Sequence, residues 1–530
     1  MPDKTNIIQV ESIFGGQSEF KYFGSKDQFQ GIYGIDPDQP SADSGTQSLR
    51  ASGYLRPVSS ERIDFTLAGA PLWMVSNPKD DKVYVYDAVG SVYSLDPNGY
   101  SMTGVGDLND AGSATGNGSA YYDNYIYFAT DSNVARYGPL NGTAAFTDSY
   151  WISGLSMSAL THTTYPSLVQ ATRVLPNHPL HLHVPNGRLY IGDVVDNQGI
   201  IHYIATTKTS VEGDTNNSST YNALDLPYGF WPTDIESYGT DLAVAMYEGN
   251  SDSVTLQKKA KLYFWDTTSS SPNKVIEKEF PDPIITALEN VNGVLYTFSG
   301  QPGALGTRVC RFVGGYSFEQ VAFIEDSEPP FPGATTEILN RILFGGLVSD
   351  VNGGTKEAGV YAIGSKTGKY NGLFNVMGAT NSSTSTDITS LAVIDQDGFN
   401  FQIPIIGWTT GSAHGIDRQT TTYDKVNQIY RSPTYRLGRP FKITKIRIPL
   451  AQAMAANMTV VPKIYVDEEG TTYTLTTLNN TNYPNSERQI VFRPENMVGK
   501  HSLFLELKWS GSALCTLALP ISIEWEPLDD

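Results

Sequence analysis

Histidines crowd one short stretch of the sequence, and their spacing is the first hint of chemistry. Three of the seven histidines fall within residues 177–183. On a strand, His181 and His183 point to the same face, so they could bind a metal ion with Asp193 as a neighbouring ligand. The alternative is that they are polar groups on a structural strand, with His178 bonded to a nearby turn. No CxxC or HExxH motif supports a metal site, and we expect no metal or other cofactor.

Acidic residues gather in several turns where their oxygens could bind calcium. These turns are residues 36–38 with Asp43, residues 395–398 and residues 467–470. None of them matches the twelve-residue loop that makes a calcium site specific. We therefore interpret them as solvated turns.

Hydrolase chemistry needs more than a large supply of acids. A glycosidase requires two carboxylates that face one pocket, and 55 Asp and Glu residues always supply some pair. The Ser-x-Asp-x-Gly-x-x-Trp turn of sialidase-type blades, the Gly-x-Ser-x-Gly elbow and the phosphate-binding Gly-x-x-x-x-Gly-Lys-Ser/Thr loop are absent from the sequence. We therefore expect no enzymatic activity, with a glycoside hydrolase built on a propeller as an alternative.

Strands must position whatever site the chain holds. Apolar and polar residues alternate between turns rich in Gly, Asn, Asp or Pro along most of the sequence, which is the pattern of half-buried strands. Charged residues make up only 17%, while Gly (49) and Tyr (31) are plentiful. This composition favours strands joined by tight turns.

A pair of apolar runs recurs seven times between residues 68 and 419. The first run of each pair is anchored in turn by Tyr84, Tyr127, Tyr190, Ala243, Tyr296, Phe344 and Ala392, at spacings of 43, 63, 53, 53, 48 and 48 residues. A period of about 50 residues is typical of four-stranded blades, which must stack because one blade cannot bury both of its apolar faces. We predict an all-β protein with a β-propeller of about seven blades over residues 68–424.

The two ends of the chain have separate predicted roles. Propeller rings are often closed by a strand from the opposite end of the chain, and the alternating residues 20–35 within the N-terminal segment 1–67 are our candidate. Residues 425–530 contain about seven short strands at the spacing of a two-sheet β-sandwich. These strands are residues 441–449, 463–466, 472–475, 489–492, 502–507, 514–517 and 521–525.

Net charge, cysteines and hydropathy exclude several classes of protein. A net charge of −19 argues against binding to nucleic acid or anionic membranes. No run reaches the roughly 18 apolar residues of a spanning helix, and the first residues lack a secretory signal. We expect a soluble protein made in a cytoplasm, without membrane insertion.

The sequence contains two cysteines, Cys310 and Cys515. They lie in different predicted domains, so we expect two buried free thiols.

Basic residues are concentrated where the predicted propeller meets the predicted sandwich. Residues 425–530 carry a net charge of +2, whereas residues 1–424 carry −21. This asymmetry predicts electrostatic docking within the chain or between neighbouring subunits, the alternative being a solvated strand face. The candidate assembly contacts are Lys425, Arg431, Arg436, Arg439, Lys442, Lys445 and Arg447.

The layout resembles virion proteins of tailed bacteriophages, in particular tail nozzle or hub proteins and tail-fibre-associated proteins. The resemblance rests on Gly31-Ile-Tyr-Gly-Ile-Asp36 ahead of the first blade, on the blade at residues 178–193, and on Arg431-Ser-Pro-Thr-Tyr435 leading into the sandwich. It implies a structural tail component of a virion, synthesised in the host cytoplasm.

That role implies partners as well. The protein would assemble with copies of itself and with other tail proteins, and would take part in adsorption to the host. The alternative is a module that binds a host-surface glycan. Its stacking candidates are Trp231, Trp265 and Trp408, for which we favour packing in the core as the alternative.

Overall fold

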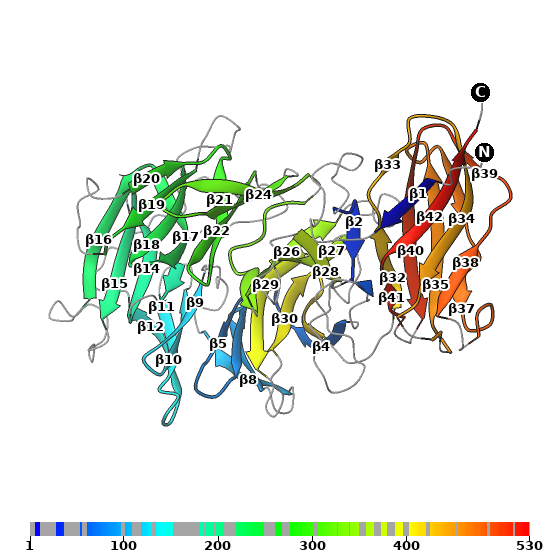
Figure 1. The fold of residues 1–530 in the computed structure, drawn as a ribbon. Coiled ribbons are helices and arrows are strands. Elements are labelled where there is room, and N and C mark those ends of the chain that lie inside the picture. The colour runs from blue at the N-terminus through cyan, green and yellow to red at the C-terminus, as the bar shows by residue number, and fades with distance from the viewer. Residues whose placement is uncertain are drawn as a thin grey trace. The chain divides into compact units, whose positions relative to one another are not determined.

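Strands make up all the regular structure of the computed structural model. The structure describes residues 6–10, 28–35, 54–55, 61–96, 101–108, 118–129, 134–151, 181–184, 187–195, 198–205, 219–248, 260–267, 276–301, 306–325, 327–338, 340–348, 357–364, 373–378, 387–395, 402–419, 425–451, 453–454, 456–484, 488–511 and 515–528. Its elements are strands β1 to β42, with no helix among the described residues (Figure 1). The all-β prediction is confirmed.

The chain divides into two compact units. Unit 1 comprises residues 1–62, 348–380 and 419–530, and unit 2 comprises residues 63–347 and 381–418. Unit 2 therefore differs from the predicted propeller range 68–424, because residues 348–380 belong to unit 1. Within unit 1, strand β28 (Leu373–Gly378) contacts β2 (Gly31–Tyr33), which accounts for that grouping.

Unit 2 is built from four-stranded antiparallel sheets whose strands follow one another in the chain. The first three sheets are β5 (Pro71–Ser76), β6 (Val83–Asp87), β7 (Ser91–Asp96) and β8 (Ser101–Asp107); β9 (Ser119–Tyr122), β10 (Tyr125–Ala129), β11 (Val134–Gly138) and β12 (Ala145–Trp151); and β13 (His181–His183), β14 (Arg188–Val195), β15 (Gln198–Ala205) and β16 (Ser219–Tyr228).

The remaining strands of unit 2 form three further four-stranded sheets, the last of them completed by a strand from earlier in the chain, and one hairpin. They are β17 (Phe230–Tyr238), β18 (Asp241–Glu248), β19 (Lys261–Trp265) and β20 (Ile276–Glu279); β21 (Ile284–Val291), β22 (Val294–Gly300), β23 (Thr307–Phe312) and β24 (Phe318–Ile324); the hairpin β25 (Thr335–Ile338) and β26 (Arg341–Val348); and β29 (Asp387–Asp395), β30 (Gln402–Thr409) and β31 (His414–Gln419) with β4 (Glu61–Leu67).

The first strand of each set forms a closed ring. Along the chain, β5 contacts β9, β9 contacts β13, and the series continues through β17, β21 and β25 to β29, which contacts β5. Apolar clusters fill the spaces between neighbouring sheets. Tyr190 of β14, for example, packs edge-on against Trp265 of β19 with ring centroids 6.2 Å apart. The sheets that begin with β5, β9, β13 and β17 thus each bury both faces against their neighbours, as blade stacking requires.

One of the seven predicted pairs differs in strand position from the others. The first five predicted pairs are the second and third strands of their sheets, but the pair anchored at Ala392 is β29 and β30, the first and second strands. The residue of β30 opposite Ala392 is Ile405. Both strands are apolar runs, so their composition does not reveal which of them is innermost.

The strand that completes the last sheet of unit 2 also differs from our candidate. That sheet is completed by β4, at residues 61–67, and the described part of residues 20–35 instead includes β2, which pairs with β32 (Lys425–Arg431) of unit 1. Residues 20–27 lie outside the described residues. The closing strand does come from the N-terminal segment 1–67, but from its far end.

Unit 1 contains two larger antiparallel sheets. One has the order β1 (Asn6–Val10), β42 (Ile521–Pro527), β34 (Phe441–Pro449) and β38 (Gln489–Phe492), with β39 (Met497–Gly499) also on β34. The other has the order β2, β32, β40 (Ser502–Gly511), β35 (Thr459–Val466) and β36 (Thr471–Thr474), with β33 (Tyr435–Arg436) on β40 and β37 (Leu478–Asn479) on β35. Unit 1 also holds the pair β3 (Tyr54–Leu55) with β41 (Leu517–Ala518) and the hairpin β27 (Glu357–Ile363) with β28.

Candidate functional site

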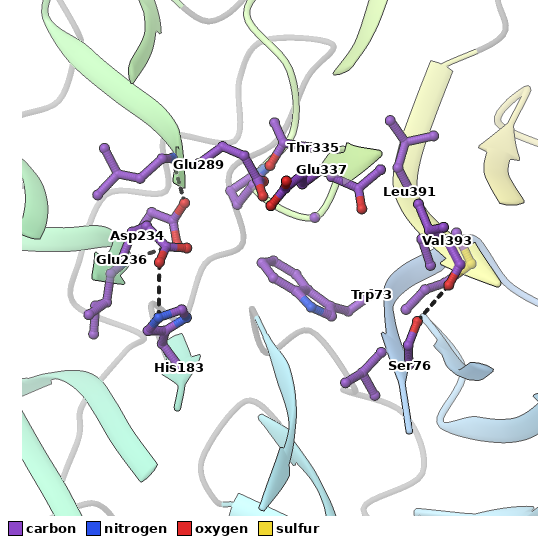
Figure 2. A pocket seen from close by; sticks show the side chains of 18 residues that line it. Trp73, Ser76, His183, Asp234, Glu236, Glu289, Thr335, Glu337, Leu391 and Val393 are labelled. Carbon is purple, nitrogen blue, oxygen red and sulfur yellow. Dashed lines mark hydrogen bonds and ion pairs between the residues drawn. The ribbon is translucent and has the colours of Figure 1, made fainter. Parts of the chain in front are cut away.

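A cavity of about 410 Å³ lies within the ring of innermost strands of unit 2 (Figure 2). Residues of six innermost strands, β5, β13, β17, β21, β25 and β29, contribute to its lining. We call it the central cavity. Its described lining includes one histidine, His183, and four acidic residues. The acidic residues are Asp234, Glu236, Glu289 and Glu337.

Equivalent positions in neighbouring hairpins bring three of these side chains to the cavity. His183 lies opposite Tyr190, Glu236 opposite Ala243, and Glu289 opposite Tyr296. In the last of these hairpins a two-residue turn, Asn292 (φ 52°) and Gly293 (φ 82°), joins the strands, as expected for an Asn-Gly turn in the left-handed region. Glu337 departs from this register and lies opposite Ile342.

The sequence contains a signal for these residues in their spacing from the repeat. His183, Glu236, Glu289 and Glu337 each precede an anchor of the repeat, at 190, 243, 296 and 344, by seven residues. A search for ionisable residues at a constant offset from the repeat would have found all four. Our search for local motifs missed the three glutamates, because about 50 residues of a blade separate each from the next.

His183 and Glu236 form an ion pair across two sheets. The Nε2 atom of His183 lies 3.2 Å from Oε1 of Glu236, and their side chains are 27% and 16% exposed. Burial alone would lower the pKa of His183, but the Glu236 carboxylate outweighs it, and the pKa of the imidazole is raised above its ordinary value. Burial would raise the pKa of Glu236, but His183 and the donors of Ser237 hold it below its ordinary value.

Asp234 links two neighbouring innermost strands. Its Oδ2 accepts a hydrogen bond from the backbone N–H of Leu288 on β21 (2.7 Å), and its Oδ1 accepts one from the N–H of Ile235 (2.8 Å). Burial, together with the neighbouring Glu236, raises the pKa of Asp234 to about 7 despite these two hydrogen bonds and the nearby His183. Asp234 therefore gains and loses a proton near neutral pH.

Glu289 and Glu337 face the same space from β21 and β25 (Figure 2). Burial and the Glu236 carboxylate raise the pKa of Glu289 well above its ordinary value, although a hydrogen bond with Thr335 opposes the shift. Burial and Glu236 also raise the pKa of Glu337. Carboxyl groups gathered in one cavity disfavour one another's ionised form, and both shifts have this direction.

The opposite side of the cavity is formed by β5 and β29. Figure 2 shows the half-buried indole of Trp73 projecting toward the side where the acidic residues gather. Beside it, the Oγ atom of Ser76 donates a hydrogen bond to the carbonyl oxygen of Val393 on β29 (2.8 Å). The cavity thus combines an aromatic wall with an acidic one.

The predicted histidine pair does not assemble as a metal site in the described part of the chain. His181 and His183 both lie on β13, opposite Gly192 and Tyr190. His183 pairs with Glu236, and Asp193 lies 3.8 Å from the buried His202. Among the described residues no group of three or more His, Cys, Asp or Glu is placed to hold a metal ion. His178 lies outside the described residues.

The three predicted stacking tryptophans and one of the acidic turns serve the structure of the chain. Trp231, Trp265 and Trp408 are 3%, 1% and 3% exposed, so the suggestion that they stack on a glycan is wrong. Asp467, from one of the acidic turns, accepts hydrogen bonds from the backbone N–H groups of Lys500 and His501. Its role is to cap a turn within unit 1.

Both cysteines are buried free thiols, as predicted for Cys310 and Cys515. Burial raises the pKa of Cys310 to about 11 and that of Cys515 to about 12. Neither thiol is therefore in the ionised form that reacts as a nucleophile.

Most of the basic residues at 425–447 have partners inside unit 1. Arg431 pairs with Glu506 (2.8 Å), Arg436 with Glu468 (3.1 Å) and Lys445 with Glu524 (3.5 Å).

The other basic residues of this stretch also lie beside groups of unit 1. Arg447 bonds Glu524, and the guanidinium of Arg439 lies 5.6 Å from the centroid of the Trp525 ring. Lys442 lies opposite Glu526 on β42, and only the backbone of Lys425, opposite Gly511, is described. Much of the positive charge is thus compensated within its own unit.

The central cavity has the carboxylates that a glycoside hydrolase requires, but most of them are engaged. Glu236 is bound by His183 and Ser237, Asp234 by two backbone N–H groups, and Glu289 by Thr335. An acid–base pair needs one carboxylate oxygen directed at a water or a sugar. What the described arrangement can do directly is attract positive charge and exchange protons.

Comparisons with known proteins concern the fold alone. No protein-family model matches the sequence, and no curated protein matches it. A β-propeller domain of Cps50 (Swd1) from Myceliophteria thermophila is similar in structure, with 10% identity, a TM-score of 0.41, and coverage of 68% of this chain and 100% of that one. The WD40 domain of Neurospora crassa Pan2 is also similar, with 8% identity, a TM-score of 0.35, and coverage of 67% and 90%. The computationally designed protein Ika8 gives 10% identity, a TM-score of 0.36, and coverage of 68% and 99%.

The chain contains a β-propeller. The fold is established by the closed ring of innermost strands with four-stranded sheets packed around it. The propeller fold leaves the activity open, since the same fold serves unrelated functions. Among the described residues, no helix is both long and apolar enough to cross a membrane.

Proposed function

We propose that the protein is a non-enzymatic structural component of a virion. It is associated with the tail, in a nozzle, hub or fibre, and acts by assembling with copies of itself and with other tail proteins. The proposal joins the resemblance of the sequence to tailed-phage virion proteins with one structural observation. Strands near the N-terminus complete sheets in both units.

Three pairings make up that observation. Strand β1 pairs with β42 near the C-terminus, β2 pairs with β32, and β4 joins the sheet of β31. Strand pairs between distant parts of a chain open only with much of the domain, so they favour cooperative, global unfolding. A subunit under mechanical load in an assembly benefits from such ties, because the ends of its chain cannot peel away singly.

The same proposal includes the finer architecture. We infer that the propeller has seven blades, since seven innermost strands share the ring. We also infer that the two larger sheets of unit 1 pack as a sandwich. A Cβ atom added to Gly499 of β39 would lie 3.0 Å from Cβ of Val466 on β35, so strands of the two sheets meet across a shared core, as in a sandwich.

Two measurements test the assembly role together. Native mass spectrometry and negative-stain imaging of the purified protein should show a homo-oligomer, in a ring or a fibre. Immunogold labelling of virions that encode the chain should mark the tail. A stable monomer that is missing from particles would overturn the proposal.

A further inference from the structure

We propose that the central cavity is a binding site for a small organic cation of the alkylammonium or guanidinium class. This inference is independent of the assembly role, because it rests on the interior of unit 2. The charge of the lining, its aromatic wall and the size of the cavity each support the proposal.

The first part is the charge of the lining. Its described residues include four carboxyl groups, one imidazole, and no lysine or arginine. The imidazole of His183 pairs with Glu236 and also acts on Asp234, so one imidazole faces four carboxyl groups within the described lining. Charge interactions are stronger in a partly buried cavity than in water, and a cation placed there would compensate the carboxyl groups not paired with His183.

The second part is the aromatic wall. The indole of Trp73 projects into the cavity from β5, opposite the acidic residues (Figure 2). Tryptophan is the strongest cation–π partner among the side chains, and the interaction gains strength when water is excluded. An aromatic face opposite carboxylates suits an organic cation, which can donate N–H bonds to the acids while its apolar part covers the ring.

The third part is the size and chemistry of the space. About 410 Å³ falls in the usual range of small-molecule pockets, roughly 300–1,000 Å³. The described residues do not arrange three ligands around a metal ion. Thr335 also lines the cavity and forms a hydrogen bond with Glu289, and its hydroxyl oxygen can accept a further N–H bond from an ammonium or guanidinium group.

Cation binding at this site must compete with protons. The titratable groups that face the cavity are His183 on β13, Asp234 and Glu236 on β17, Glu289 on β21 and Glu337 on β25, and the described lining from β5 and β29 has none. Burial raises the pKa of Asp234 to about 7 and raises the pKa values of Glu289 and Glu337 above their ordinary values, so protons compete with a cation for these carboxyl groups. Binding of a cation therefore releases protons, and the affinity rises with pH.

Isothermal titration calorimetry with the full chain tests this inference. The probes are putrescine, guanidinium and tetramethylammonium, with 1,4-butanediol as the uncharged match for putrescine and maltotriose as a neutral sugar. We expect at least one cation to bind, with at least a tenfold gain in affinity between pH 6 and pH 8. The apparent enthalpy should depend on the ionisation enthalpy of the buffer, because protons are released.

Three variants locate the site. Glu337→Gln and Trp73→Leu should each weaken binding of the cation about tenfold, which corresponds to about 1.4 kcal/mol. Glu319→Gln is the matched control, because Glu319 lies on the outermost strand β24 and pairs with Arg311; it should bind like the wild type. Glu289→Gln serves in place of either cavity variant that fails to fold.

The inference is overturned by any of three results: none of the cations binds, the diol or the sugar binds as tightly as the diamine, or the cavity variants bind like Glu319→Gln. Failure here would leave the assembly role untouched, because that role is tested by particle labelling and oligomer mass. Cleavage of maltotriose would instead revive the hydrolase alternative.

Discussion

His183 Nε2 lies 3.2 Å from Glu236 Oε1, and this contact joins the innermost strands of two adjacent sheets. Each residue changes the ionisation of the other. The pKa of the imidazole is raised and the pKa of the carboxyl is lowered. The ion pair also affects the other carboxyl groups of the cavity. The negative charge of Glu236 raises the pKa values of Asp234, Glu289 and Glu337.

Replacing Glu236 with glutamine should lower the pKa of His183. Burial disfavours the charged imidazole, and in the variant no carboxylate at 3.2 Å opposes it. An NMR titration of the histidine ring C–H resonances measures the change. His414, bonded to Thr409 in a different sheet, supplies the internal reference resonance. An unchanged midpoint for His183 would refute the ion pair.

The stability of unit 2 should fall as the pH rises from about 5 to about 8. A carboxyl group whose pKa is raised in the folded state keeps a proton that the unfolded chain releases, so its stabilising effect is complete below the unfolded pKa and is lost as the pH passes the folded pKa. Asp234, with a pKa of about 7, and Glu289 and Glu337, with raised pKa values, all act in this direction. Loss of the proton from His183, whose pKa is also raised, adds to the effect.

Glu289→Gln should flatten this pH dependence. Glutamine resembles the protonated acid, so the variant should match the wild type near pH 5 and melt at a higher temperature near pH 8. Thermal melts at several pH values measure it. Glu236, whose pKa is lowered, contributes stability above its unfolded pKa and loses it only as the pH falls further, so it does not mask the effect. Parallel melting curves for the two proteins would contradict the prediction.

Leu67→Ala should destabilise unit 2 by about 2–5 kcal/mol, the range for a buried leucine. Leu67 is 5% exposed on the closing strand β4, and it packs in a cluster with residues of β5 to β7 and β29 to β31. Urea denaturation monitored by fluorescence measures the loss. Leu528→Ala is the matched control, because Leu528 is 37% exposed, and it should change stability by less than about 0.5 kcal/mol. Equal effects of the two substitutions would mean that β4 does not close the propeller.

Arg431→Met and Arg436→Met should separate a folding role from an assembly role. The side chains of Arg431 and Glu506 are 12% and 3% exposed, whereas Arg436 is 51% exposed. Loss of Arg431 leaves Glu506 buried with only Lys463 (3.5 Å) and the Tyr465 hydroxyl (3.2 Å), so unit 1 should lose about 3 kcal/mol. Loss of Arg436 should cost less than about 1 kcal/mol.

Oligomer mass decides between the roles for these two arginines. We expect Arg436→Met to reduce the oligomer without lowering the melting temperature, because its guanidinium is the more accessible one. Reduced assembly in a fully stable Arg431→Met protein would contradict the folding role assigned to Arg431.

Strands and hairpins were predictable from the sequence because their signals are local. Alternation of apolar and polar residues depends on one strand, and a turn such as Asn292-Gly293 depends on the backbone preferences of two residues. The all-β class and the recurrent pairs followed from these signals alone. The position of the last pair within its sheet could not be predicted in this way. Both β29 and β30 are apolar, and only packing decides which of them faces the ring.

The tertiary structure alone decided which distant residues meet. Strand β4, not residues 20–35, completes the last sheet, and the basic residues Lys445 and Arg447 find Glu524 near the other end of the chain. The candidate site also depends on contacts between distant parts of the chain, because its ionisable side chains come from four innermost strands. These residues are His183, Glu236, Glu289 and Glu337. The sequence by itself determined that the chain forms strands with a repeat of about 50 residues. Their convergence on one cavity depends on closing the ring, since contacts between distant segments are set by packing and loop closure and not by any local pattern.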